Sequence, residues 1–105
     1  MIEFVNKPPA VVVGRDHLLR ITDVAFSGIC KVVAEYAPNW DQTKGKRGGS
    51  YESGVLVNPT WGELIRQAQL QLERTGDYAH CYFEGVQVVK SNVDKPSILE
   101  LLMRS

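Results

Sequence analysis

The stretch PTWGELIRQAQLQLERTG, residues 59–76, carries helix signals at both ends and therefore constrains the fold most. Thr60 and Glu63 have capping-box spacing, in which each side chain satisfies a free backbone amide of the first turn. Gly76 can adopt the left-handed conformation that ends helices. The apolar residues recur at helical spacing and form one stripe, namely Trp61, Leu64, Ile65, Ala68 and Leu72. The opposite face is expected in solvent, with Leu70 as the apolar exception among Arg66, Gln67, Gln69, Gln71 and Glu73.

Length and charge narrow the class of protein. A chain of 105 residues corresponds to one domain, and a composition of 44% hydrophobic and 23% charged residues is typical of a folded globular protein. Twelve basic and twelve acidic residues give zero net charge. No overall field therefore attracts nucleic acid, and any binding of a polyanion has to be local.

The ends of the chain and the cysteines suggest a cellular compartment. The N-terminal MIEFVNKPPAVVV has an acidic residue early and no basic stretch before an apolar run, unlike a signal peptide. The longest uncharged stretch is too short to cross a bilayer. We therefore expect a cytoplasmic protein with no membrane partner, in which Cys30 and Cys81 are buried thiols.

An alternating stretch, DYAHCYFEGVQVVKS, follows the helix at residues 77–91. If Glu84-Gly85 is a two-residue turn, the flanking segments pair as a hairpin. Strand alternation then places one set of side chains on the core face, namely Ala79, Cys81, Phe83, Val86 and Val88. The other face carries Tyr78, His80, Tyr82, Gln87 and Val89. The alternative is that Glu84-Gly85 forms a bulge within one longer strand.

The segment from His17 to Tyr36 fits two periodicities. A helical stripe would contain Leu18, Ile21, Ala25, Ile29, Val32 and Tyr36, whereas the part from Val24 onward also alternates as a strand does. Many of these residues are β-branched and lose less side-chain freedom in a strand. We expect strands, bent or broken at Ser27-Gly28, with a helix as the alternative.

Short apolar runs mark further strands, IEFV and AVVV near the N-terminus and SGVLVN at residues 53–58. They leave residues 38–52 as a flexible, basic, glycine-rich loop. A loop of this length in a compact domain is usually functional or disordered.

The C-terminal KPSILELLMRS has Ser97 and Glu100 at capping-box spacing, which predicts a short helix. Its apolar residues leave no clean polar face, so the segment is either buried or presented to a partner. The residues expected at an oligomer interface are Ile98, Leu99, Leu102 and Met103.

These elements predict a single α+β domain over residues 1–105. In that domain a mostly antiparallel sheet packs against one main amphipathic helix, with a short C-terminal helix. The expected order is strands, long basic loop, strand, helix, hairpin and short helix.

The loop sequence TKGKRGGS, residues 43–50, raises the question of phosphate binding. It lacks the glycine and hydroxyl positions of a P-loop, and the chain has no G-x-G-x-x-G. A basic hairpin tip can nevertheless contact a nucleic-acid backbone, with aromatic side chains stacking on bases. The residues of this hypothesis are Trp40, Lys44, Lys46, Arg47 and Tyr51.

Motifs of catalysis and metal binding are absent from the sequence. It contains no G-x-S-x-G, no C-x-x-C and no H-x-x-x-H, and neighbours such as His80 and Cys81 point to opposite faces of a strand. We name no catalytic residue, and we expect neither metal nor cofactor. The sequence therefore favours a non-enzymatic protein.

The aromatic stripe Tyr78, His80 and Tyr82 is the most specific remaining feature. Aromatic side chains on a half-exposed sheet serve interfaces and ligand pockets, although packing within a second core layer is an equal alternative. The preferred hypothesis is an interaction module that forms a homodimer or higher oligomer. The alternatives are nucleic-acid binding through residues 40–51 and a small-ligand pocket, possible also as an enzyme site, lined by Trp61 and the stripe.

Overall fold

The computed structural model describes residues 10–36 and 49–104, which form six strands and two helices. The elements in chain order are β1 (Val12–Val13), α1 (Arg15–Leu19), β2 (Ile29–Tyr36), β3 (Gly49–Glu52), β4 (Leu56–Val57), α3 (Trp61–Thr75), β5 (Tyr82–Lys90) and β6 (Ser97–Arg104).

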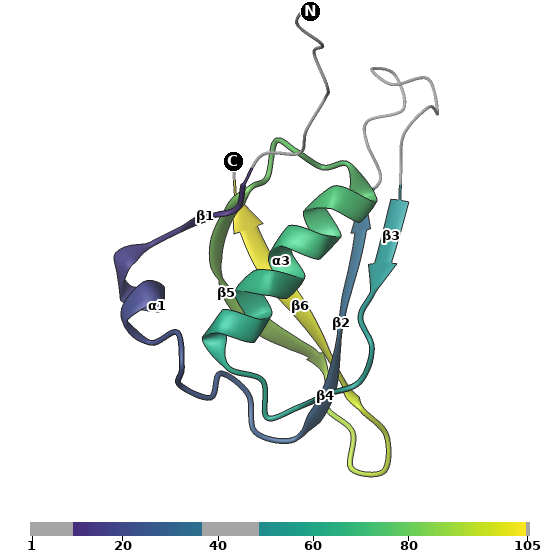
Figure 1. The fold of residues 1–105 in the computed structure, drawn as a ribbon. Helices are drawn as coiled ribbons and strands as arrows, with labels where there is room; N and C mark the ends of the chain where they lie inside the picture. Colours follow the sequence, from purple (N-terminus) through teal and green to yellow (C-terminus); the bar gives the residue numbers. More distant parts are fainter. Residues whose placement is uncertain (1–9, 37–48, 105) are drawn as a thin grey trace, which may run out of the picture.

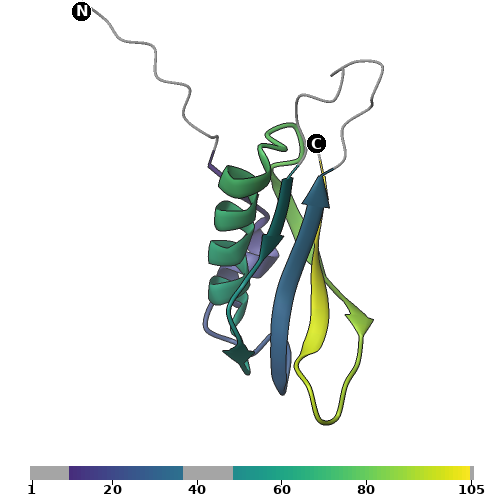
Figure 2. The ribbon, with the colours of Figure 1, turned by 90° about the vertical axis from the view of Figure 1, so that its right-hand side faces the viewer.

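The strands form one mixed sheet with the order β1-β5-β6-β2-β3, and β4 pairs with β2 beside this path. The pairs β1–β5 and β2–β6 are parallel, whereas β5–β6, β2–β3 and β2–β4 are antiparallel. Helix α3 lies across one face of the sheet (Figure 1). Within the described residues no helix or strand covers the other face, which we call the open face (Figure 2). The α+β prediction is confirmed, but the sheet is mixed rather than mostly antiparallel.

Helix α3 begins and ends where the sequence predicts. The Glu63 amide donates to the Thr60 hydroxyl oxygen at 3.1 Å, and Gly76 takes the left-handed conformation with φ 77°. Its buried residues Leu64, Ala68 and Leu72 face the sheet. The buried core cluster joins helix and strands and comprises Cys30, Val32, Leu64, Ala68, Phe83, Leu99 and Leu101.

The predicted C-terminal helix is wrong, because Ser97–Arg104 forms strand β6. This strand lies between β5 and β2 in the middle of the sheet, so both of its faces accommodate apolar side chains. Leu99 and Leu101 are buried toward α3, whereas Leu102 lies on the open face. The Ser97 hydroxyl accepts a hydrogen bond from the Asn92 amide at 3.1 Å instead of capping a helix.

The predicted hairpin at 77–91 is also wrong, and its alternative is confirmed. Strand β5 runs unbroken from Tyr82 to Lys90 and pairs with β6 throughout. The register shifts between Phe83 and Gly85, so Glu84 is the extra residue of a bulge. Gly85 is buried with φ 153°, a conformation that favours glycine. Residues 76–81 form a loop before the strand rather than part of it.

The N-terminal part combines both interpretations of the sequence. Helix occurs only at Arg15–Leu19, and the strand begins at Ile29, with irregular backbone between them. Strand β3 lies inside the predicted loop 38–52, and the predicted strand 53–58 shortens to the two residues of β4. The IEFV run and residues 37–48 lie outside the described residues.

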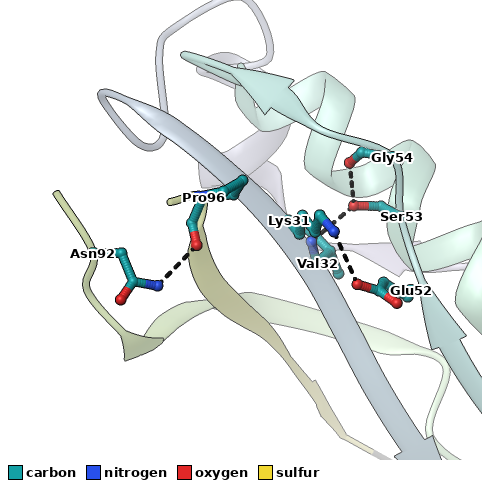
Figure 3. A network of polar contacts seen from close by, with 7 residues as sticks. All are labelled: Lys31, Val32, Glu52, Ser53, Gly54, Asn92 and Pro96. Carbon is teal, nitrogen blue, oxygen red and sulfur yellow. Dashed lines mark hydrogen bonds and ion pairs between the residues drawn. The ribbon is translucent and has the colours of Figure 1, made fainter. Parts of the chain in front are cut away.

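Ser53 joins β3 and β4 at the point where the edge of the sheet is interrupted. Its hydroxyl accepts from the Val32 amide at 2.8 Å and donates to the Gly54 carbonyl at 2.8 Å (Figure 3). The Ser53 amide in turn donates to the Val32 carbonyl at 2.8 Å. The side chain thus replaces a ladder bond, and this accounts for a buried polar residue.

Candidate binding cleft between β2 and β6

Strands β2 and β6 separate halfway along the sheet. Their register ends at Val32–Leu99, after which β2 continues along β3 and β6 continues along β5 (Figure 1). A cleft of about 530 Å³ lies there, and we call it the β2–β6 cleft. Its lining residues are Val33, Ala34 and Glu35 of β2, Glu100, Leu101 and Met103 of β6, Val89 of β5, Gln71 of α3, and Asp77 and His80 of the following loop.

Gln71 is the polar side chain that α3 contributes to the cleft. It is only 9% exposed, and its amide oxygen has no hydrogen-bond partner among the described residues. The prediction that Gln71 lies on a solvent-exposed face is wrong. It stands seven residues after Leu64 and three after Ala68, so helical spacing places it on the buried stripe. The helical spacing of Gln71 from Leu64 and Ala68 is therefore the sequence signal for its burial, although its polar side chain suggests exposure.

The loop after α3 fixes the orientation of His80. The His80 amide donates to the Asp77 carbonyl at 3.2 Å, and the imidazole Nδ1 lies 2.8 and 2.9 Å from the two carboxylate oxygens of Asp77. The Thr75 hydroxyl donates to the Gln71 carbonyl at 2.8 Å within the last turn of the helix, and it accepts from the Asp77 amide at 3.4 Å, which ties the loop to that turn. Because a carboxylate only accepts hydrogen bonds, His80 donates to Asp77 through Nδ1.

The cleft is acidic. Glu35, Asp77 and Glu100 are among its lining residues, and no lysine or arginine of the described part of the chain lines it. One carboxylate oxygen of Glu100 accepts from the side-chain Nε2 of Gln87 at 3.2 Å, and the carboxylate can accept further hydrogen bonds. Apart from Gln71 and His80, the other described lining residues have aliphatic or thioether side chains.

The described lining residues offer groups for reversible binding. Among residues 10–36 and 49–104, none of the side chains that line the cleft is a serine, threonine, cysteine or lysine that His80 could activate as a nucleophile. Across residues 10–36 and 49–104, no group of three or more histidine, cysteine, aspartate or glutamate side chains is arranged to hold a metal ion.

The predicted aromatic stripe is divided between different places. Tyr78 and His80 lie in the loop, whereas Tyr82 begins β5 with the Arg104 guanidinium 4.7 Å from its ring centre. Trp61 packs against His17, with ring centres 4.8 Å apart, at a separate aromatic contact near α1. Of the residues predicted for small-ligand binding, only His80 lines the β2–β6 cleft.

Tyr51 is the one described residue of the nucleic-acid hypothesis. Its hydroxyl donates to the Gln67 side-chain oxygen of α3, and burial raises its pKa, an effect that Arg66 partly opposes. The side chain is thus engaged with the helix. Trp40, Lys44, Lys46 and Arg47 lie outside the described residues, and nucleic-acid binding stays a prediction.

The predicted interface residues divide between the two faces of β6. Leu99 is fully buried, and Met103 packs against the core. Ile98 and Leu102 alternate with them and point to the open face. The cysteines also differ, because Cys30 lies in the core whereas Cys81 is partly exposed, and neither forms a disulfide.

Comparisons with known proteins add no assignment, since no family model, no curated protein and no solved structure matches the chain. In the described part of the chain, neither helix has the length and apolar character needed to cross a membrane.

Proposed function

We propose that the protein is a small interaction module that forms a homodimer through the open face of its sheet. The observation that carries this proposal is a group of exposed aliphatic side chains on that face. Ile29 is 52% exposed, Val57 is 63% exposed and Leu102 is 38% exposed. Ile29 and Val57 are register partners on neighbouring strands, so their side chains lie side by side.

The size of the face is adequate for association. Strands β2, β5 and β6 have eight or nine residues each, and β3 and β4 add a fourth, interrupted row of four and two residues. With strands about 4.8 Å apart and a rise of about 3.3 Å per residue, these rows give about 500 Å² of flat sheet. Two copies would bury about 1,000 Å², which is below the range of about 1,200–2,000 Å² for stable interfaces and corresponds to weak association. A weak dimer is therefore the expected form.

The charges on the open face favour a second copy over a strongly charged partner. Lys31 pairs with Glu52 at 3.2 Å, and Arg104 pairs with Glu84 at 2.5 Å. Both signs of charge thus flank the aliphatic side chains (Figure 3 shows the first pair). A two-fold axis brings each patch against its own copy, and a face carrying both signs can complement itself.

Sedimentation velocity at tens of micromolar protein tests the proposal. The wild type is expected at twice its chain mass of 11.7 kDa, and I29K and V57K are each expected to be monomeric. Because both side chains are more than half exposed, these variants should keep the far-ultraviolet circular dichroism of the wild type. V93K serves as the matched control, since Val93 is fully exposed in the loop before β6. A monomeric wild type, or dimers that survive both lysine substitutions, would overturn the proposal.

A further inference from the structure

We infer that the β2–β6 cleft binds an aliphatic organic cation, that is, an alkylammonium or alkylguanidinium group. This ligand class follows from the charge, the hydrogen-bonding groups and the walls of the cleft. It rests on other side chains than the dimer proposed above, and a different assay tests it.

The charge of the lining selects a cation. Glu35, Asp77 and Glu100 contribute carboxylates, and among the described lining residues the only basic one is His80, whose Nδ1 is held by Asp77. A concave site lined by one sign of charge concentrates ligands of the opposite sign. N–H groups of an ammonium or guanidinium ion also form the strong, charge-assisted hydrogen bonds that carboxylates prefer.

Gln71 supplies a second and independent observation. Its amide oxygen is buried and lacks a partner among the described residues, although buried acceptors in proteins are nearly always paired. Gln71 lines the cleft, and the last side-chain torsion of glutamine is soft, so the amide can reorient toward a bound donor. A ligand N–H donor would then satisfy it. Donor-poor anions would leave it unpaired and would also meet the carboxylates.

The walls and the volume select an organic cation over a metal ion. Val33, Leu101 and Met103 provide apolar surface for an aliphatic stem, and Met adapts to its shape. A volume of about 530 Å³ is far larger than a bare ion requires and lies within the range of small-molecule pockets.

Such a cation can come from a free amine or from an arginine or lysine side chain of a partner protein. Two probes distinguish these sources in amide and side-chain NMR titrations of the full chain. Agmatine represents the free ligand, and a capped Gly-Ser-Arg-Ser-Gly peptide represents a partner. Pentanol, which has a similar stem and no charge, controls for apolar binding.

We expect saturable shifts of the His80, Glu100 and Leu101 amides and of the Gln71 side-chain amide with at least one cationic probe. E100Q should weaken binding about three- to fivefold, as expected for a partly exposed ion pair, and Q71M should weaken it about fivefold by removing one hydrogen-bond acceptor. E73Q is the matched control, because Glu73 is an exposed acid of α3 that does not line the cleft. The E73Q variant should bind the cationic probe with the affinity of the wild type.

The outcomes are decisive in each arm. Saturation by agmatine alone assigns the cleft to a free amine, and saturation by the peptide alone assigns it to a partner side chain. Absence of saturable shifts with both probes, equal binding of pentanol, or affinities unchanged in E100Q and Q71M would overturn the inference. A monomeric protein that binds agmatine would refute only the dimer.

Discussion

Replacing Gln71 by methionine is expected to stabilise the fold. In the structure Gln71 is only 9% exposed, and its side-chain amide oxygen lacks a hydrogen-bond partner among the described residues. Methionine has a similar length and carries no group that needs a hydrogen bond. It would lie beside Leu101 and Met103, which line the same cleft.

The magnitude follows from the cost of an unpaired buried acceptor, about 1–3 kcal/mol. Loss of any bond made by the amide nitrogen offsets about 1 kcal/mol of this, and glutamine and methionine have nearly equal helix propensities. A net gain of about 1 kcal/mol remains. For a domain of this size, that gain corresponds to a rise in Tm of about 4 °C or more.

Urea denaturation followed by circular dichroism measures the change. With a slope of about 1.5 kcal/mol per molar urea, the unfolding midpoint should rise by about 0.7 M. Q67M is the matched control, because Gln67 lies four residues earlier on the same helix and accepts from the Tyr51 hydroxyl. That variant should lose about 1 kcal/mol. If Q71M destabilises the protein as much as Q67M does, the Gln71 oxygen is satisfied in solution and the reasoning fails.

Four further predictions concern the remaining polar groups and thiols. T60A should lower the free energy of unfolding by about 1 kcal/mol through loss of the helix cap. A decrease of less than about 0.3 kcal/mol, measured by urea denaturation, would contradict that role. S53A should cost about 1–3 kcal/mol, because it leaves the buried Val32 amide unpaired, and hydrogen exchange at that amide should accelerate. Ellman's reagent should modify Cys81 in the native protein and Cys30 only on unfolding. Burial, with a smaller effect of Glu63, raises the pKa of the Cys30 thiol, so its contribution to stability is complete below the ordinary thiol pKa of about 8.5 and is lost as pH rises through the raised value. C30A should flatten that alkaline decline, and an unchanged slope would refute it.

The sequence was a reliable guide where local signals act alone. Helix α3 is specified by Thr60, Gly76 and a stripe of apolar residues, all of which operate within one segment of the chain. The β6 strand was misinterpreted because its position between two other strands depends on residues far away. A central strand is apolar on both faces, and this removes the alternation that distinguishes a strand from a short buried helix.

The candidate site was only partly predictable for a related reason. His80 was named, but as a member of an aromatic strand face, whereas Asp77 and a helix stop hold it in a loop. Gln71 was assigned to solvent by residue type, although its spacing from Leu64 placed it on the core side. The cleft itself arises because β2 and β6 follow different partners, and no pattern within either strand encodes that separation.

The position of β6 also affects how the domain can form during translation. Cys30 pairs with Ser97, so the residues that form the parallel contact at the centre of the sheet are 67 positions apart in the chain. Pairing over such a distance is slow, because a long chain segment must be ordered before any contact is made. While residues 97–104 are still inside the ribosome, β5 lacks its antiparallel partner and the two halves of the sheet have no strand between them. The nascent chain then exposes Val32 and Phe83, which are normally buried, and this interval is when chaperone binding or aggregation would compete with folding.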